Sequence, residues 1–217
     1  MSHKPYKGFS PKWVDAPADA RSWRSIFRWG KPDYFKWPKE NLYKVIKDTF
    51  NMSDEDFAKY DGSLGFGPVD YDVPSKMEPR HIAAFKAIVG EGYVRTDNYS
   101  RLSVAYGKTM HDVLRLRQKV VENVPDAVLY PDAREQVESI VAYCAINRIP
   151  VYVYGGGSSV TRGVECIKGG VSLDMRLRYN KVISFDEKDQ TITVQTGMSG
   201  PKLEATLNDA ASLFGAK

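Results

Sequence analysis

The amino-acid sequence predicts an α+β protein in which extended chain and helices, over residues 1–124, precede an α+β domain over residues 125–217. Two observations support this organisation. Prolines and glycines interrupt the chain up to residue 37, which favours extended segments over a packed domain. Beyond residue 125, apolar runs of strand length alternate with amphipathic helical periodicity, and three glycines directly follow the second run.

The composition is typical of a globular protein with a buried core, since 42% of the 217 residues are hydrophobic and 27% are charged. No apolar stretch approaches the roughly 20 residues that a transmembrane helix needs. The first residues also lack the apolar segment of a secretory signal. We therefore expect a cytoplasmic protein. Its cysteines, Cys144 and Cys166, are expected to be reduced, with Cys144 buried on a helix face.

Positive charge and tryptophan are concentrated in the first 40 residues, which hold nine Lys/Arg, four Asp/Glu and all four tryptophans. A basic aromatic arm of this kind is compatible with nucleic acid or an anionic membrane surface. We favour an extension that wraps a larger body, because no nucleic-acid motif follows and the charge forms no dense run. We thus predict no nucleic-acid partner and leave a peripheral membrane contact open.

Four helices are expected in the region before residue 125. Apolar residues recur at helical spacing over 42–50, and Ser53 begins a second short helix. A third helix is predicted over 79–90, with proline at its start and a left-handed glycine at its end. Thr109 caps a fourth helix, which is expected to continue to Pro125.

A strand–helix–strand pattern is the clearest structural signal in the sequence. The apolar run 127–130 is followed by Asp132 and Glu135, whose spacing resembles a capping box. Apolar residues then recur at helical spacing over 137–144, and a second apolar run covers 149–154. We therefore expect a βαβ unit with two parallel strands and a right-handed connection. Further strands are predicted over 171–174, 181–185 and 191–195, and a final helix from Gly200.

The second strand leads directly into the segment Gly155–Ser159, which we call the glycine loop. Successive glycines let backbone N–H groups approach an anion, and the two serines add hydroxyl donors. A P-loop would need a Gly-Lys-Ser/Thr ending, and a Rossmann fingerprint would open a helix, which residues 160–164 do not resemble. Glycine clusters are often only flexible connections, but the position after an apolar strand favours binding.

Other candidate groups remain ambiguous from sequence. Arg162 could neutralise a phosphate or lie solvated, and Tyr154 could stack on a ligand ring or close the core. His111, in a predicted helix, is expected at the surface. The sequence shows no metal-ligand cluster, no nucleophile with a histidine partner and no convincing carboxylate pair.

Residues from about Pro125 to Asn208 resemble the vanillyl-alcohol-oxidase, or PCMH-type, FAD-binding domain, of which this would be the first α+β subdomain, a βαβ unit plus further strands. Within that family the chain looks most like alkyldihydroxyacetonephosphate synthase and bacterial FAD-linked oxidases. The matching residues are Pro131, Ile149-Pro150-Val151, Gly155–Ser159, Gly163, Val171–Asp174 and Thr196-Gly197, with weaker support from Arg21-Ser22-Trp23, Trp29-Gly30 and residues 106–117.

The resemblance implies that FAD lies between two α+β subdomains, with its pyrophosphate on the backbone of the glycine loop and Pro131 near the adenine. Ser158 stands where threonine is usual in the family, which keeps the hydroxyl. No histidine lies near the loop, so the resemblance implies non-covalent FAD. The cofactor-binding residues expected are Pro131, Tyr154, Gly155, Gly156, Gly157, Ser158, Ser159, Val160 and Gly163.

Family members are longer than this chain, so the resemblance implies an N-terminal fragment or one subunit of a split enzyme. The expected partners are FAD and the remaining C-terminal half or a second subunit, with a homo-oligomer left open. No catalytic residue is assigned, and the fragment alone is expected to be inactive. The implied activity is an FAD-dependent oxidoreductase or an alkylglycerone-phosphate-synthase-like transferase. The alternatives are a D-2-hydroxyacid (lactate or glycolate) dehydrogenase and a non-catalytic flavoprotein subunit or scaffold.

Overall fold

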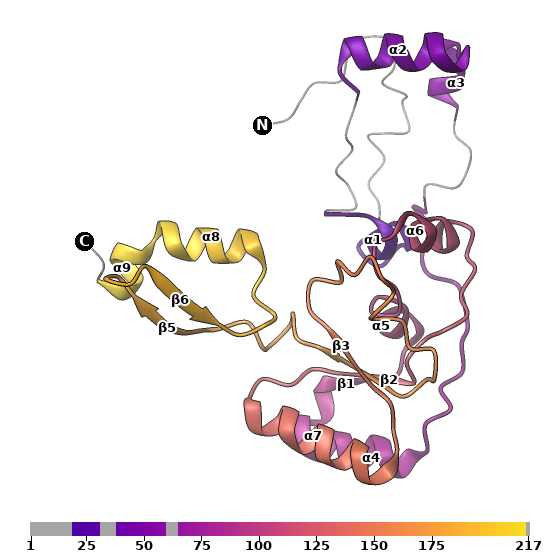
Figure 1. Ribbon diagram of the computed structural model, residues 1–217. Coiled ribbons are helices and arrows are strands. Elements are labelled where there is room, and N and C mark those ends of the chain that lie inside the picture. The colour runs from indigo at the N-terminus through magenta and orange to yellow at the C-terminus, as the bar shows by residue number, and fades with distance from the viewer. Residues whose placement is uncertain (1–18, 31–37, 60–64, 216–217) are drawn as a thin grey trace. The chain divides into compact units, whose positions relative to one another are not determined.

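The computed structural model describes residues 19–30, 38–59 and 65–215, which form two compact units (Figure 1). One unit contains the chain up to Asp70 together with Val113–Val120. The other contains Tyr71–Asp112 and the chain from Val121 onward. The second unit therefore contains the segment Tyr71–Asp112 in addition to the predicted α+β domain. The predicted boundary at residue 125 itself stays a prediction.

The second unit is built on a four-stranded sheet with the strand order β1-β2-β4-β3. Its strands are β1 (Val94–Arg95), β2 (Ala127–Leu129), β3 (Val151–Tyr154) and β4 (Val171–Asp174). β2 and β3 both pair with β4 in parallel, whereas β1 pairs with β2 antiparallel. The predicted βαβ strands are thus parallel, as expected, but they are not neighbours, because β4 lies between them.

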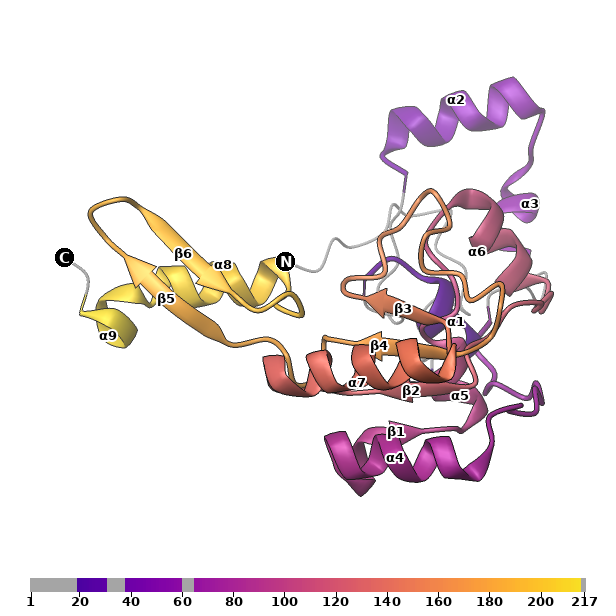
Figure 2. The same ribbon diagram turned by 60° about the horizontal axis from the view of Figure 1, so that its bottom comes forward.

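Alternation along β2 divides the side chains between two apolar clusters. Ala127 and Leu129 belong to the cluster under helices α4 (Pro79–Val89) and α7 (Arg134–Asn147), and Val128 belongs to the other. Such a period of two is what a pleated strand imposes. Figure 2 shows α4 and α7 running along the same side of the sheet. The buried members of the helix-side cluster are Phe85, Val89, Val94, Ala127, Leu129, Ile140, Cys144, Val171, Leu173 and Met175.

The second cluster contains Val104, Val128, Tyr154 and Val164. A short helix, α5 (Asn98–Leu102), precedes Val104. Its Arg101 is 1% exposed and donates from Nε to the Pro125 carbonyl at 2.6 Å. A buried guanidinium that satisfies backbone carbonyls in this way fixes the chain just before β2.

Helix α7 confirms one prediction from the sequence and contradicts another. The helix is present, and Ile140 and Cys144 are buried as its amphipathic pattern predicts. The predicted capping box is wrong, because the N-cap is Ala133 and no side chain caps the helix. The Asp132 carboxylate pairs instead with Arg178, and a charged partner outcompetes local capping.

The other predicted helices agree with the structure except at their ends. α4 begins with Pro79 at its first turn, and Gly90 ends it at φ 94° and ψ 149°, a positive-φ conformation outside the left-handed helical region predicted. Thr109 caps α6 (Met110–Arg117) by accepting from the Asp112 N–H at 2.9 Å. That helix ends well before Pro125, since Lys119 adopts φ 59°.

The first unit contains α1 (Trp23–Phe27), α2 (Glu40–Phe50) and α3 (Asp54–Ala58), the last with the expected capping box from Ser53. Trp23 is 2% exposed and donates from Nε1 to Asp70 at 3.1 Å. This tryptophan is therefore an interior anchor. Trp13 and Trp37 lie outside the described residues.

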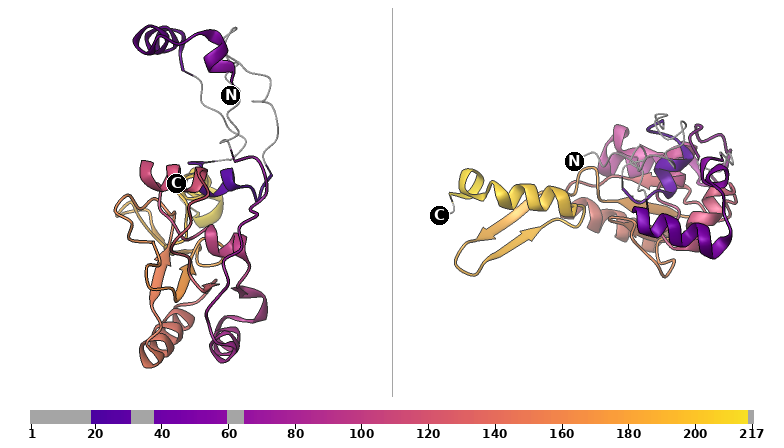
Figure 3. Two further views of the ribbon diagram at one scale, coloured as in Figure 1. Left: turned by 90° about the vertical axis from the view of Figure 1, so that its right-hand side faces the viewer. Right: turned by 90° about the horizontal axis from the view of Figure 1, so that it is seen from above.

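The C-terminal part of the second unit is a hairpin of β5 (Val182–Asp186) and β6 (Thr191–Val194), followed by α8 (Gly200–Asn208) and α9 (Ala210–Phe214). Figure 3 shows the yellow helices running beside the orange hairpin. Phe185 of β5 stacks on Phe214 of α9 with ring centroids 4.8 Å apart. The hairpin and its following helix were both predicted from sequence.

Both cysteines are buried and free; burial was expected for Cys144 alone. Burial raises the pKa of Cys144 to about 11 and that of Cys166 to about 12, so neither thiol ionises readily near neutral pH. Within the described ranges, none of the helices combines the length and the hydropathy needed to cross a bilayer.

Helix α7 offers a direct test of the core assignment. Ile140→Ala should lower the free energy of unfolding by about 2–5 kcal/mol, because it leaves a cavity between α7 and the sheet. Ile146→Ala on the same helix should change it by less than about 0.5 kcal/mol, because Ile146 is 82% exposed. Urea denaturation followed by circular dichroism measures both, and equal effects would contradict this packing.

Candidate functional site

The carboxyl ends of three parallel strands meet at one edge of the sheet. There β2 leads toward Pro131, β3 into Gly155, and β4 into Met175. The Met175 N–H donates to the Tyr154 carbonyl at 3.0 Å, which ties the exits of β3 and β4 together. Ligands of open parallel sheets bind at this kind of edge. The glycine loop and Pro131 therefore share the edge where a ligand is expected.

Gly157 is the residue of the loop that only glycine can fill. It is buried, has φ +66°, and a Cβ there would overlap the Tyr154 hydroxyl. Both the backbone conformation and the available space exclude a side chain. Tyr154 is itself 2% exposed and closes the second apolar cluster beneath the loop.

Gly156 and Ser158, by contrast, are exposed. A Cβ on Gly156 would meet nothing within 4 Å. At Gly156, therefore, the described residues leave open space beside the backbone of the loop. A cradle for a phosphate group needs this combination of a fixed inner side and an open outer side.

Residues 107–108 hold the far end of the glycine loop. The Lys108 N–H donates to the Ser159 carbonyl at 2.9 Å, and a Cβ on Gly107 would overlap that same carbonyl. The Ser159 Oγ accepts from the Gly163 N–H at 3.0 Å. The loop is therefore fixed both by an upstream segment and by its own continuation.

Arg162 has a partner within the protein, which neither of the two sequence interpretations included. Its Nε lies 2.5 Å from Glu165 Oε2, and the hydrogen bond to Glu165, together with the charge of that carboxylate, raises the pKa of Arg162. The Glu165 side chain is 2% exposed and also accepts from Asn123 Nδ2 at 2.7 Å. Arg162 is thus an ion-pair partner beyond the loop, and sequence reasoning missed both Glu165 and Asn123.

Two cationic residues near the loop, Arg176 and Lys108, were not among the predicted cofactor-binding residues. Arg176 donates from Nε and Nη2 to the Asp174 carboxylate at 2.9 and 2.6 Å and lies 4.5 Å from the Tyr154 ring centroid. Burial lowers the pKa of Arg176, but the Asp174 carboxylate outweighs it and the net shift is upward. Burial lowers the pKa of Lys108 to about 8; the Arg176 charge adds to this and Asp112 opposes it.

Pro131 is buried and sits between two groups that Arg178 binds. Arg178 donates to the Tyr130 carbonyl at 3.0 Å and pairs with Asp132. Its guanidinium lies 3.5 Å from the Tyr93 ring centroid, a close cation–π contact. These contacts of Arg178 hold the chain in place at the end of β2.

The structure brings most of the predicted site residues to one edge of the sheet. Val160 is 64% exposed and Gly163 is exposed, whereas Tyr154 lies in the core below the loop. The contacts of all nine residues with a cofactor stay predictions. His111 is exposed, as expected. In the part of the chain that the structure describes, no group of His, Cys, Asp and Glu is arranged to hold a metal.

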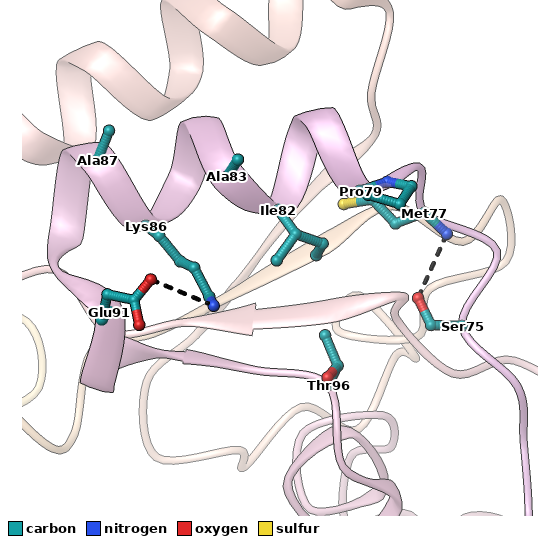
Figure 4. Close-up of a pocket in the computed structure, with 9 residues that line it drawn as sticks. All are labelled: Ser75, Met77, Pro79, Ile82, Ala83, Lys86, Ala87, Glu91 and Thr96. Atoms are coloured by element: carbon teal, nitrogen blue, oxygen red, sulfur yellow. Dashed lines mark hydrogen bonds and ion pairs between the residues drawn. The ribbon is translucent and has the colours of Figure 1, made fainter.

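Two surface hollows among the described residues lie outside the glycine loop. A groove of about 740 Å³ follows one side of α4 (Figure 4), with Lys86 and Glu91 paired at 3.4 Å on its rim. A second hollow of about 680 Å³ adjoins Arg162, Gly163 and Glu165. Neither of these two hollows is lined by the loop residues Gly155–Ser159.

Residues 125–217 match the FAD binding domain family. This segment belongs to that family. FAD is accordingly the cofactor of the domain, and the resemblance stated from the sequence is confirmed.

Alkyldihydroxyacetonephosphate synthase of Dictyostelium discoideum is 32% identical over 138 residues, which are 62% of this chain and 22% of that protein. A probable mitochondrial D-lactate dehydrogenase of Danio rerio is 25% identical over 135 residues, 62% of this chain and 25% of that protein. A solved structure of alkyldihydroxyacetonephosphate synthase superimposes with a TM-score of 0.61 at 30% identity, covering 65% of this chain and 26% of that one. The predicted fold class is thus confirmed, and the chain spans about a quarter of these relatives.

The special role of Gly157 can be tested without any ligand. Gly157→Ala should lower the free energy of unfolding by more than about 1 kcal/mol, because alanine is strained at positive φ and meets the Tyr154 hydroxyl. Gly156→Ala, one residue earlier and facing open space, should change it by less than about 0.5 kcal/mol. Denaturant unfolding compares the two, and a tolerated Gly157→Ala would show that the loop is not conformationally fixed.

Proposed function

We propose that the glycine loop binds the diphosphate of FAD non-covalently and that the chain is the FAD-binding part of an alkyldihydroxyacetonephosphate-synthase-like flavoenzyme. The observation that carries this proposal is the geometry of the loop at the carboxyl edge of β3. Gly157 fixes the inner side against Tyr154, and Gly156 leaves the outer side open. A glycine loop with this combination of a fixed and an open position suits a dianionic diphosphate, which backbone N–H groups can bind.

Each part of the chain has a defined task in this proposal. The loop and its support at Lys108 hold the diphosphate, and the exit of β2 at Pro131 borders the adenine side. Bound FAD supplies an isoalloxazine ring that accepts electrons from, or captures, an organic substrate. Residues for that chemistry are not assigned in this chain, whose proposed partner is the rest of the enzyme, on the same polypeptide or a second subunit.

The second candidate activity is oxidation of a D-2-hydroxyacid. The Danio rerio relative, a probable D-lactate dehydrogenase, favours it, although at 25% identity it is less similar than the synthase at 32%. A non-catalytic flavoprotein subunit is the alternative from another class. Turnover of an alkylglycerone-phosphate precursor or of D-lactate by the complete enzyme, or of neither, would distinguish the three candidate functions. A cytoplasmic location stays a prediction.

Gly156→Leu tests the binding site directly. The new side chain should fit the fold, because nothing lies within 4 Å of its Cβ, yet it would occupy the space proposed for the diphosphate. We expect flavin retention to fall at least about tenfold, a loss of about 1.4 kcal/mol or more. The measurement is the visible absorption retained after mixing with FAD and filtration.

Gly92→Leu is the matched control, since a Cβ on Gly92 also meets nothing within 4 Å and Gly92 lies in the 3₁₀ turn Glu91–Tyr93, outside the loop. It should retain flavin like the unchanged chain. Acid precipitation should release all flavin into the supernatant, because the proposed binding is non-covalent. Equal retention by both variants would refute the loop as the diphosphate site.

A further inference from the structure

Arg176 leaves β4 beside the point at which the glycine loop leaves β3. Tyr154 and Asp174 form the last residue pair of these two strands. Gly156 and Arg176 each lie two positions beyond that pair. The Met175 N–H donates to the Tyr154 carbonyl at 3.0 Å, which keeps the two chains together as they leave the sheet. Because adjacent strands lie about 4.8 Å apart, Arg176 enters this edge next to the loop.

Two contacts fix the Arg176 side chain. The Asp174 carboxylate accepts from its Nε at 2.9 Å and from its Nη2 at 2.6 Å. The guanidinium carbon lies 4.5 Å from the centroid of the Tyr154 ring. The hydroxyl of the same tyrosine occupies the space in which a Cβ of Gly157 would lie. One aromatic ring therefore packs against both the guanidinium and the inner side of the glycine loop.

One edge of this guanidinium is not used by the protein. Asp174 takes Nε and Nη2, and among the described residues Nη1 donates no hydrogen bond. The Asp174 side chain is 4% exposed, whereas that of Arg176 is 42% exposed. The ion pair thus has its carboxylate in the interior and its cationic end at the surface. A guanidinium held along one side presents its remaining donors in a fixed direction, which suits a phosphate oxygen.

The positive charge of Arg176 also acts on the segment that supports the loop. Burial, and then the charge of Arg176, lower the pKa of Lys108 to about 8, and the charge of Asp112 opposes this shift. The Lys108 N–H is the group that donates to the Ser159 carbonyl at the far end of the loop. A charge that repels a neighbouring cation attracts an anion at the same place.

We propose that Arg176 binds the diphosphate of FAD through its Nη1 group and so adds a side-chain cation to the backbone cradle of the glycine loop. This inference rests on the proposed function. Nη1 donates to a phosphate oxygen while Nε and Nη2 stay on Asp174. The arginine is therefore preorganised, and binding costs little ordering of its side chain.

A purely structural role for Arg176 predicts a different behaviour. If the arginine only satisfied Asp174, another cation at this position would leave FAD affinity unchanged. Lysine keeps a positive charge for the Asp174 carboxylate, but its single ammonium has no second donor edge. Arg176→Lys therefore separates a phosphate contact from support of the end of β4, and Arg176→Met removes the charge altogether.

The first measurement is a flavin-fluorescence titration of the 217-residue chain with FAD at neutral pH. Arg176→Met should raise the dissociation constant at least about tenfold, because a charge-assisted hydrogen bond is lost. Arg176→Lys should raise it at least about threefold, because a positioned donor is lost while the charge remains. Circular-dichroism melts show which variants fold. Arg176→Lys, which keeps a partner for buried Asp174, decides the question if Arg176→Met unfolds.

Arg80→Met is the matched control. Arg80 also pairs with a carboxylate, that of Glu78, but at the first turn of α4 and outside the loop. This variant loses the same charge and one ion pair, and it should bind FAD like the unchanged chain. Phosphorus NMR of saturating bound FAD adds a readout at the diphosphate itself. The phosphorus resonances should shift in Arg176→Lys and stay in place in Arg80→Met.

The outcomes separate the two proposals. Weaker binding and shifted phosphorus resonances in Arg176→Lys, with neither in Arg80→Met, would support the inference. Unchanged affinity in Arg176→Lys, or weaker binding with unshifted resonances, would overturn it; loss of flavin by Gly156→Leu would then leave the proposed function standing. Failure of the unchanged chain to bind FAD, or full retention of flavin by Gly156→Leu, would overturn both.

Discussion

The pairing of β4 with both β2 and β3 is the constraint on which the candidate site depends. Parallel pairing places the three carboxyl ends at one edge, where Pro131, Gly155 and Met175 leave the sheet. The edge holds its shape because apolar side chains fill both faces. Helices α4 and α7 cover one face, and Tyr154 closes the cluster on the other. The core thereby reaches directly beneath the glycine loop.

Patterns local in sequence predicted much of this arrangement. Strand and helix periods over 127–154 gave the βαβ unit, and the three glycines after β3 gave the loop, because both signals reside in neighbouring residues. The cofactor, FAD, was predicted from the resemblance to the family. The insertion of β4 between β2 and β3 was not foreseen, since strand order depends on pairing between residues far apart in the chain.

The residues that sequence reasoning missed act through distant partners. Glu165 binds Asn123, 42 positions away, and Arg178 binds Asp132, 46 positions away. The second pair also explains the failed capping box, because the aspartate that resembled a cap is held by a guanidinium instead. The periodicity of apolar residues along a sequence does not predict pairs of side chains so far apart in the chain. Gly107 and Lys108 lie in the stretch 106–117 that supported the resemblance weakly, but their contact with the loop became visible only when the fold placed them against Ser159.

The charges at this edge follow a consistent physical logic. Arg162, Arg176 and Arg178 each pair with a carboxylate, respectively Glu165, Asp174 and Asp132. Such pairs fix backbone segments around the loop and reduce the positive charge available to a ligand. Burial, and then the charge of Arg176, lower the pKa of Lys108 to about 8, and the charge of Asp112 opposes this shift. Because these pairs hold the surrounding segments in place, the glycine loop keeps its shape beside the open space at Gly156, and such a loop suits a phosphate group.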